Sequence, residues 1–422
     1  MFSKLLANQY FVSLLKKSST IVFGIISVAF LSRAMGPEIK GEYDTFINIV
    51  CILNVALNFG ISTIYPNYVR KREDWTLSTF MGFSLIQLLL YLAVAIVCFA
   101  IVGDTTILLV LLCLALSIFT IQMNNISLVE SYRLNAVANI LSAVFNAFLA
   151  GALFACQVTD IDAFLALYCV KEMIVGFIAI VGLRRSFSGR MVSFRQMPRM
   201  LMVGFIPMLT NLLVMVNYRI DVIFLNYFDV QFGQIGLYTA GLALAEYAWI
   251  IPDIFKDVLI NKTARNDDIR SVTFCVRAAT TFMLLSYAVL IVGGKVLIEL
   301  LYGSAFSGAY GVTVVVFAGV FSMIYCKLLG TLYIAQGRWN FYCAVLAIGV
   351  ALNVCANCLF IPHFGIYGAA ATTVISYSVI GLSFLITFKR AYSLKLSELV
   401  LLNGPDVKRL REVASSLKTR KG

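Results

Sequence analysis

The chain has 422 residues, of which 61% are hydrophobic and 13% are charged. Soluble domains carry charge on about 25% of their residues, so this composition excludes an ordinary soluble protein and indicates a chain that crosses a membrane many times. The 33 Lys and Arg outnumber the 21 Asp and Glu, which gives a formal net charge of +12. The positions of these charges must separate a nucleic-acid-binding protein from the loop bias of a membrane protein.

Apolar runs predict the secondary structure, because a helix needs roughly 20 apolar residues to cross a bilayer. About twelve such runs follow one another along the chain. The first six lie near residues 12–32, 42–65, 78–101, 106–129, 136–156 and 162–183, and the second six near residues 201–227, 235–255, 277–300, 310–334, 341–361 and 365–388. The predicted fold class is therefore an all-α polytopic membrane protein.

Positive charge determines the predicted orientation of these spans. With the N- and C-termini both in the cytoplasm, nearly all of the 33 Lys and Arg fall in cytoplasmic loops or in the tail, as the positive-inside rule requires. Because the charge is spread over alternate loops rather than gathered on one face, we expect no nucleic-acid partner. The exceptions are Arg33, Lys40 and Lys295 on the periplasmic side, and Lys171, Arg219 and Lys327 inside spans.

Two pairs of short motifs indicate an internal duplication. Gly41-Glu-Tyr43 opens the second span and Gly236-Leu-Tyr238 the eighth, at an offset of 195 residues (236 − 41). Arg133-Leu-Asn135 and Arg338-Trp-Asn340 follow spans four and ten, at a similar offset of 205 residues (338 − 133). We therefore predict a 6+6 parallel repeat, with a substrate path between the two halves.

The repeat divides the chain into three predicted parts. Residues 1–195 form an N-terminal six-helix lobe with a basic cytoplasmic connector, which runs from Arg184 to Arg199. Residues 196–388 form a C-terminal six-helix lobe, and residues 389–422 form a basic cytoplasmic tail.

The ten cysteines lie almost all in apolar segments, where a thiol behaves as a small hydrophobic group. Cys355 and Cys358 have zinc-like spacing, but no second pair of ligands accompanies them, and His363 is interpreted as a loop residue. We therefore predict no metal site and no cofactor.

The seventh span carries two charges, Arg219 and Asp221. An ionised side chain near a membrane centre costs about 2.5–3.5 kcal/mol on insertion scales, so such residues usually face a bundle interior or an aqueous path. Arg219 and Asp221 are two residues apart, about 200° around a helix, and so point to different faces. Each therefore needs a partner from another helix, from water or from a substrate.

Four motifs resemble one protein family. Leu31-Ser-Arg-Ala-Met-Gly-Pro-Glu-Ile-Lys-Gly-Glu-Tyr43 lies at the outer end of span one, Leu301-Tyr-Gly-Ser-Ala-Phe306 follows span nine, and Phe364-Gly-Ile-Tyr-Gly-Ala-Ala370 enters span twelve. Together with Arg219-Ile-Asp-Val-Ile-Phe-Leu225 they look like the Wzx-type O-antigen flippases. These form part of the polysaccharide-transport branch of the multidrug/oligosaccharidyl-lipid/polysaccharide exporter superfamily. The resemblance covers spans one to twelve and not the tail.

The resemblance implies a protein of the bacterial inner (plasma) membrane. Such a protein moves undecaprenyl-pyrophosphate-linked oligosaccharide, the O-antigen repeat unit of lipopolysaccharide biosynthesis, from the cytoplasmic to the periplasmic leaflet. It implies alternating access of two six-helix lobes, coupled to a gradient of H⁺ or Na⁺. The implied partners are membrane lipids, a polysaccharide polymerase and a chain-length regulator.

An anionic sugar-pyrophosphate headgroup needs cationic partners along an aqueous path. Arg suits phosphate best because its planar fork donates two parallel hydrogen bonds, whereas Lys acts as a point charge. Aromatic faces and amides suit the sugars. The predicted substrate-binding residues are the cations Arg219, Lys327, Lys171 and Arg33, and the sugar-binding candidates Asn217, Tyr218 and Asn211.

Structural roles compete with these binding roles. Arg219 in a buried pair with a carboxylate is one alternative. A second alternative concerns Lys171, which adjoins Glu172: it forms an ion pair with that residue or extends its ammonium group toward the membrane surface. In the third alternative, Arg33 has a structural role at a helix end, because the nearby Gly36 and Pro37 are residues that stop helices.

Three carboxylates within spans are the predicted ion-coupling groups: Asp221, Glu246 and Asp253. Glu246 and Asp253 are seven residues apart and share a face of span eight, with Pro252 kinking the helix beside Asp253. Desolvation favours the protonated form of a buried carboxylate, which suits a proton carrier. The alternative is a static salt bridge to Arg219 or Lys327. Asp44, near the outer end of span two, is expected to be a mouth or helix-cap residue.

Two other functions compete with the flippase. A drug/cation antiporter of the same superfamily would favour carboxylates in its path, whereas Arg219, Lys171 and Lys327 favour an anion. A membrane enzyme, such as a polysaccharide polymerase or a glycosyltransferase, would need a sizeable outer loop or a metal-binding carboxylate cluster. The predicted outer loops are short, and Asp160-Ile-Asp162 lies in an outer turn with no basic partner. We therefore expect no enzymatic activity and no catalytic residues.

Overall fold

The computed structural model describes residues 9–70, 76–187, 193–263, 269–402, 404 and 406, and within these ranges the chain forms helices and no strands. The predicted all-α class is confirmed for this part of the chain. Residues 188–192 of the predicted connector and residues 407–422 of the predicted tail lie outside it.

Contacts between residues divide the chain into two compact units. Unit 1 comprises Met1–Gly236 and Leu300–Phe306, and unit 2 comprises Leu237–Glu299 and Ser307–Gly422. By these contacts the helix of the predicted seventh span belongs to unit 1. The division into repeat lobes at residue 195 concerns the order of spans along the chain, and it stays a prediction.

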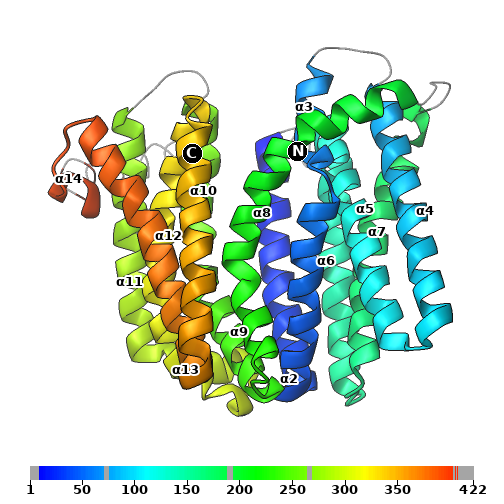
Figure 1. Ribbon diagram of the computed structural model, residues 1–422, viewed down its shortest axis with the longest axis horizontal. Helices are drawn as coiled ribbons and strands as arrows, with labels where there is room; N and C mark the ends of the chain where they lie inside the picture. The colour runs from blue at the N-terminus through cyan, green and yellow to red at the C-terminus, as the bar shows by residue number, and fades with distance from the viewer. Residues whose placement is uncertain are drawn as a thin grey trace, which may run out of the picture. The chain divides into compact units, whose positions relative to one another are not determined.

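Unit 1 is built from long helices that pack side by side (Figure 1). Helix α2 contacts α5, α6 and α8, while α5 contacts α4 and α7, so α2 and α5 lie at the centre of the unit. One apolar core joins Val50 of α2 to Cys113 of α5 and Leu165 of α7. The helices are α2 (Gln9–Leu57), α3 (Ile61–Val69), α4 (Thr76–Val102), α5 (Thr105–Glu130), α6 (Tyr132–Ala155), α7 (Ile161–Phe187), α8 (Met197–Tyr227) and the start of α9 (Phe232–Glu246).

Helix α2 is broken at Gly36, whose φ of 64° and ψ of 177° are not helical. Glycine adopts a positive φ without the steric penalty of a Cβ atom, and Pro37, which follows it, cannot donate a hydrogen bond to the preceding turn. Figure 1 shows the two legs of α2, deep blue and blue, meeting at the lower end of unit 1. The Gly-Pro signal in the sequence therefore marks the turn between the first two predicted spans.

The predicted second span, 42–65, is too long. The second leg of α2 ends at Leu57, and Ile61–Val69 form the separate helix α3. Phe59 and Gly60 between them both have positive φ, 54° and 69°. The apolar sequence runs through this turn without a gap, so hydropathy alone does not reveal the break.

The two glycines of the repeated motif contact each other. A Cβ atom added at Gly41 would overlap the carbonyl oxygen of Phe232, and one added at Gly236 would overlap that of Pro37. Pro37 and Phe232 are 195 residues apart (232 − 37), as are the two glycines. The close crossing of α2 and α9 is thus symmetric under the offset that the sequence repeat predicts.

Unit 2 contains the remainder of α9, the short 3₁₀ turn Tyr247–Trp249 and helices α10 to α14. Their bounds are α10 (Ile250–Thr263), α11 (Ile269–Tyr302), α12 (Ala309–Ala335), α13 (Trp339–Ala391) and α14 (Ser397–Val400). Helix α12 packs against α10 and α13. The indole N–H of Trp249, in the 3₁₀ turn, donates a hydrogen bond of 2.8 Å to the carbonyl of Val320 on α12.

Helix α13 is an antiparallel hairpin of two legs. Gly365 interrupts it with a φ of 53° and a ψ of −130°. Asn353 donates to Ser376 at 3.2 Å, although the two are 23 residues apart, and Thr372 donates to Asn357 at 2.7 Å. In an unbroken helix 23 residues span roughly 35 Å, so these contacts require the chain to reverse. The two legs correspond to the predicted spans 341–361 and 365–388.

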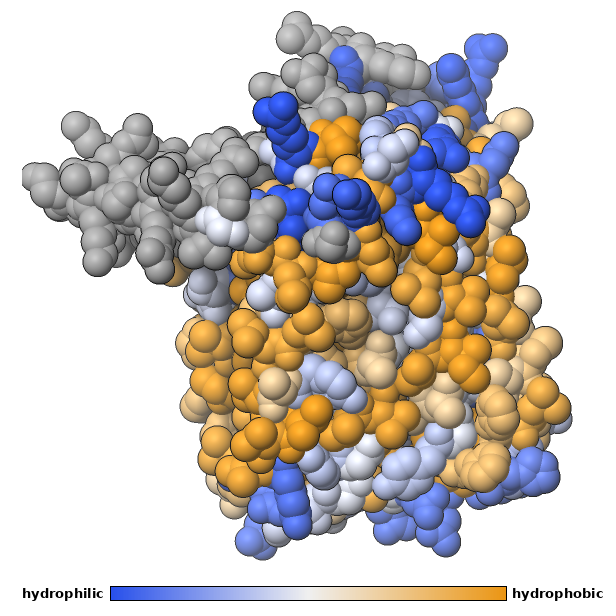
Figure 2. Space-filling view, turned by 90° about the vertical axis from the view of Figure 1, so that its left-hand side faces the viewer, coloured by the Kyte–Doolittle hydropathy of each residue, from blue (hydrophilic) through white to orange (hydrophobic). Residues whose placement is uncertain are grey.

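Ten helical segments among the described residues are long and apolar enough to cross a membrane, and α2 and α13, each interrupted by a glycine, are among them. Figure 2 shows a broad hydrophobic band with hydrophilic residues above and below it on the face drawn. Exposed apolar residues such as Val292, which is 90% exposed, face outward from α11. The chain is a multi-pass membrane protein. The count of twelve crossings and the cytoplasmic location of both termini stay predictions.

The described part of the tail is attached to α11. The guanidinium of Arg277 donates to both carboxylate oxygens of Asp406, at 2.7 and 2.8 Å, and to the carbonyl of Glu398 at 2.9 Å. Leu399 of α14 is fully buried. The segment after α13 is therefore packed onto unit 2 by a bidentate ion pair and an apolar anchor.

Candidate functional site

A cavity of about 480 Å³, here called cavity A, lies inside unit 1 between both legs of α2 and helices α5, α6 and α7. Polar side chains line it on all of these helices, although the helices themselves are strongly apolar. Its charged and amide-bearing wall residues are Lys40, Asp44, Asn124, Asn139, Asn146, Lys171 and Glu172. A membrane protein places such groups where a bundle interior or an aqueous path receives them.

Cavity A contains two ion pairs. The Lys171 ammonium lies 2.9 Å from a carboxylate oxygen of Glu172, and the Lys40 ammonium lies 2.8 Å from Asp44. Lys171 also lies over the ring of Tyr168, with 4.2 Å between its Nζ and the ring centroid. Glu172 is only 8% exposed. The charge of each lysine is therefore balanced by a carboxylate within the cavity. An anion that binds either lysine must displace that carboxylate.

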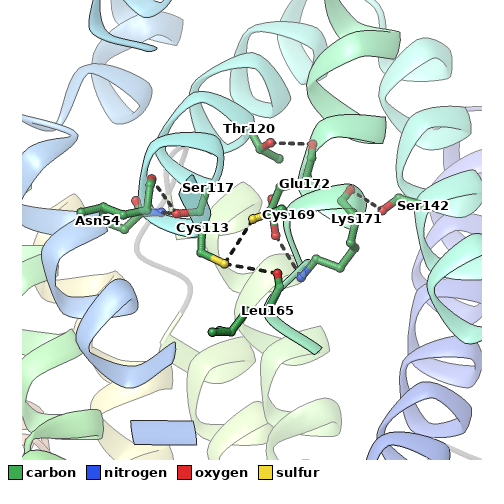
Figure 3. Close-up of polar contacts among 10 residues, drawn as sticks. Asn54, Cys113, Ser117, Thr120, Ser142, Leu165, Cys169, Lys171 and Glu172 are labelled. Carbon is green, nitrogen blue, oxygen red and sulfur yellow. Dashed lines mark hydrogen bonds and ion pairs between the residues drawn. The ribbon is translucent and has the colours of Figure 1, made fainter. Parts of the chain in front are cut away.

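Neighbouring helices hold the segment that carries Lys171 and Glu172. The hydroxyl of Thr120 on α5 donates to the carbonyl of Glu172 at 2.8 Å, and that of Ser142 on α6 donates to the carbonyl of Lys171 at 3.1 Å (Figure 3). These bonds fix the backbone of α7 from two sides. The charged side chains are therefore positioned by hydroxyl groups one helix away rather than by their own helix alone.

A second cavity of about 310 Å³, here called cavity B, lies between α2, α3, α5 and α8 of unit 1. Tyr65 anchors α3 beside it by donating a hydrogen bond to the carboxylate of Glu130. Burial, together with the hydrogen bond to that carboxylate, raises the pKa of Tyr65 well above its usual range, so the phenol keeps the proton that it donates. The residues of cavity B include Asn211 and Tyr218, two of the predicted sugar-binding residues.

The other predicted residues of α8 have different surroundings. Asp221 is 1% exposed and Arg219 is half-buried, in agreement with their placement on different helix faces. Neither is among the residues that line cavities A and B. Asn217 is fully buried, and neither atom of its amide has a hydrogen-bond partner among the described residues. Buried amides without partners are rare in folded proteins, but Asn217 does not border either cavity.

Two predicted residues of unit 2 pair with each other. Lys327 donates to Asp253 at 3.0 Å, and its Nζ lies 4.1 Å from the centroid of the Trp249 ring. From the sequence, Lys327 was predicted to bind substrate and Asp253 to take part in ion coupling, with a static salt bridge as the alternative. Glu246 ends α9, and Asp253 lies on α10 beyond the 3₁₀ turn Tyr247–Trp249. The helix is therefore irregular before Pro252 rather than at it, and the shared face of Glu246 and Asp253 stays a prediction.

The Lys327–Asp253 pair predicts a stability effect without a transport effect. Replacing either residue alone, as Lys327→Met or Asp253→Asn, should destabilise the protein by about 1–2 kcal/mol, because one charge of a half-buried pair loses its partner. The double variant should lose less than the sum of the two. Thermal unfolding in detergent measures this, with Lys295→Met on α11 as the matched control. A double variant that is stable but inactive in transport would instead assign the pair to the substrate path.

Arg33, predicted at the outer mouth of span one, is exposed and donates a 2.6 Å hydrogen bond to the carbonyl of Leu300. Leu300 lies in the last turn of α11, where carbonyl groups have no partner within the helix. A cation there also interacts favourably with the helix dipole. In this structure Arg33 binds a helix end, and it lines neither cavity A nor cavity B.

Several residues of the two cavities were not among the sequence-predicted ones. Glu172 was considered only as a partner that neutralises Lys171, and Asn54, Asn58 and Asn125 were not considered. Asn54 and Asn58 are four residues apart, on one face of an otherwise apolar run. That spacing is a sequence signal for a polar helix face, and it points to cavity B.

The fold has known structural neighbours. The lipid II flippase MurJ in an inward closed conformation matches with a TM-score of 0.72 and 16% identity, over 92% of this chain and 89% of that chain. A multidrug resistance MATE family transporter of the MOP superfamily in an inward-facing conformation matches with a TM-score of 0.68 and 13% identity, over 89% and 94%. A MOP superfamily transporter from Pyrococcus furiosus matches with a TM-score of 0.62 and 12% identity, over 92% and 96%.

The likeness confirms a polytopic helical fold like that of MATE transporters and MurJ. At these identities it shows the fold alone. The chain matches no known family pattern and no curated protein. The resemblance to Wzx-type flippases therefore rests on the four sequence motifs and not on these comparisons.

Proposed function

We propose that this protein is a flippase that moves undecaprenyl-pyrophosphate-linked oligosaccharide from the cytoplasmic to the periplasmic leaflet of a bacterial inner membrane. Two six-helix lobes alternate access, with both termini in the cytoplasm. Fold likeness to a lipid II flippase supports this reading, as do the four motifs that resemble Wzx-type proteins. The sugar-pyrophosphate headgroup is the polar, anionic part that needs a path through the helices.

The observation that carries the proposal is cavity A, where Lys171 and Lys40 lie inside a unit of apolar helices. A pyrophosphate crossing the membrane needs cations at depth, because an unpaired anion in a low-dielectric interior is costly. Lys171 supplies one and is only partly exposed, with 32% of its side-chain surface accessible. Its present partner, Glu172, keeps the cavity near neutral until an anion arrives.

Coupling to an ion gradient follows from the exchange of partners. When the pyrophosphate binds the ammonium group of Lys171, the mostly buried carboxylate of Glu172 loses its cation. Such a group is stabilised by taking up a proton or a Na⁺ ion. Binding of the headgroup and binding of the coupling ion are therefore linked through one residue pair. Arg219 and Asp221 on α8 remain candidates for a second step of the path.

A drug/cation antiporter is the second candidate function. Glu172 and Asp44 in cavity A favour it, because carboxylates attract cationic drugs, and the MATE transporters among the structural neighbours share the fold. The two functions differ in which member of the Lys171–Glu172 pair the substrate contacts. An anionic substrate requires the lysine, whereas a cationic one requires the glutamate.

Transport in proteoliposomes tests the proposal. The purified protein is expected to move a labelled polyprenyl-pyrophosphate oligosaccharide to the opposite leaflet, and to leave a cationic dye untransported. Dye transport without lipid transport would establish the antiporter. In cells that lack the protein, repeat units should accumulate on the inner leaflet. Accumulation on the outer leaflet would indicate a polymerase instead.

A further inference from the structure

Cavity B differs from cavity A in its charge. The described residues that line it include no Asp, Glu, Lys, Arg or His. Its wall instead carries the side chains of Asn54, Asn58, Asn125, Asn211, Ser62 and Tyr218. Ile121 of α5 lies on the wall of both cavities, so a charged cavity and a neutral amide-lined cavity adjoin the same helix.

The amides of cavity B have hydrogen-bonding capacity that the protein does not use. Asn54 is 5% exposed; its Nδ2 donates to Ser117 at 2.8 Å, and its Oδ1 has no partner among the described residues. Asn125 and Asn211 make no side-chain hydrogen bond to any residue that the structure describes. The Oδ1 atom of Asn54 is enclosed, whereas Asn125 is half-buried and Asn211 is exposed. The amides of Asn125 and Asn211 are therefore open to a polar ligand in the cavity, and each offers donors and an acceptor that the protein leaves unused.

The chemistry of this wall fits sugar hydroxyls. Each Asn amide offers a carbonyl acceptor and two N–H donors, which match hydroxyl groups that both donate and accept. Tyr218 adds an aromatic ring with an apolar face and a polar tip. With about 310 Å³, the cavity lies at the lower end of the range of roughly 300–1,000 Å³ for small-ligand sites. It accommodates part of a glycan rather than the whole.

We propose that cavity B is a selectivity site for the uncharged sugars of the lipid-linked glycan, next to cavity A, which takes the charged headgroup. This inference rests on the proposed flippase function and deepens it. Figure 3 shows Asn54 and Lys171 on opposite sides of the polar cluster, with Ser117 of α5 between them. The sugars that fit are neutral hexoses or N-acetylated amino sugars.

An acidic sugar is disfavoured at this site. Its carboxylate would leave water for a cavity whose wall offers amides but no cation, and a buried charge without a counterion is costly. The site thus rejects uronic acids by leaving their charge uncompensated, and it accepts neutral sugars by hydrogen bonding. Selection of this kind combines an energetic cost for the wrong ligand, the uncompensated charge, with favourable hydrogen bonds to the right one.

The test uses the Asn125→Leu and Asn211→Leu variants of the full chain in proteoliposomes. Because these two amides bond to no described residue, their loss leaves no internal group without its partner. With a neutral-sugar polyprenyl-pyrophosphate substrate, each variant should raise KM about 10-fold. With sugar-free polyprenyl pyrophosphate, each should behave as the unmodified protein. Asn226→Leu, an exposed position on the same helix α8, is the matched control.

The unmodified protein should also transport a neutral-sugar substrate at least about 10-fold more efficiently than a uronic-acid one. Equal transport of both, or equal losses of the Leu variants with and without sugar, would overturn the selectivity site while leaving the flippase intact. Failure of the unmodified protein to move any polyprenyl pyrophosphate, together with dye transport, would remove the flippase itself and this inference with it.

Discussion

Replacing Lys171 by methionine is expected to lower transport of polyprenyl-pyrophosphate oligosaccharide by about 10- to 100-fold. The ammonium of Lys171 is the cation of cavity A that lies deep in a predicted span, and its ion pair with Glu172 is 2.9 Å long. Methionine keeps most of the length of the side chain, but it offers no charge to a phosphate or to the ring of Tyr168. Initial rates of leaflet transfer in proteoliposomes measure the effect.

Glu172→Gln separates binding from coupling at the same pair. Glutamine keeps the shape of the side chain without its charge, so no carboxylate at this position competes with phosphate for Lys171. Headgroup binding is expected to be at least as tight as in the unmodified protein, whereas stimulation of transport by a pH gradient is lost. If Na⁺ is the coupling ion, a Na⁺ gradient replaces the pH gradient in this measurement. Both gradients are therefore applied separately.

Matched controls lie on α11, outside both cavities. Lys295→Met and Glu299→Gln change the same chemical groups at positions that line neither cavity A nor cavity B, and both should transport normally. Lys171→Met with a full transport rate would exclude cavity A from the headgroup path. Dye transport by the unmodified protein that is lost in Glu172→Gln, without lipid transport by either, would favour the drug antiporter.

The sequence predicted the helical class and many of the helices, because long apolar runs have one stable solution in a bilayer. The two legs of α13 follow the predicted spans 341–361 and 365–388 closely. Breaks were found where Gly and Pro coincide, as at Gly36-Pro37. The break at Phe59-Gly60 was missed, since a single glycine in an apolar run does not distinguish a kink from a packed helix position.

The site could be predicted only in part, because its partners come from different helices. Lys171 was identified from its depth in a span, and Glu172 beside it was considered as its neutralising partner. The pairing of Lys327 with Asp253 joins α12 to α10. The sequence offered it only as one of several possible salt bridges, because no local pattern encodes a contact between two helices. The same holds for Asn54 and Asn125, which reach cavity B from α2 and α5. Periodicity gives the face of one helix, whereas a cavity needs the register of several.

Gly41→Ala and Gly236→Ala are each expected to destabilise the protein by about 1–3 kcal/mol, because a Cβ atom at either position overlaps a backbone carbonyl. Side chains can rotate away from a clash, but the carbonyls of Phe232 and Pro37 move only with their helices. The midpoint of thermal unfolding in detergent should fall by several degrees, on the order of 3–10 °C.

Gly233→Ala is the control with the opposite expected sign. It lies on the same helix as Gly236, and a Cβ atom added there has no neighbour within 4 Å. Alanine is favoured over glycine within helices by roughly 0.5–1 kcal/mol, so this variant should unfold at an unchanged or higher temperature. An equal fall for all three variants would indicate a general effect of the substitution rather than the crossing.

The two glycine variants also test the internal duplication. The offset of 195 residues relates Gly41 to Gly236 and Pro37 to Phe232, so each glycine meets the carbonyl that its counterpart's helix presents. If the crossing descends from a duplicated element, the two substitutions should cost similar free energies. Their double variant should cost less than the sum, because a single separation of the two helices relieves both clashes. Strictly additive losses would mean that the two contacts are energetically independent of each other.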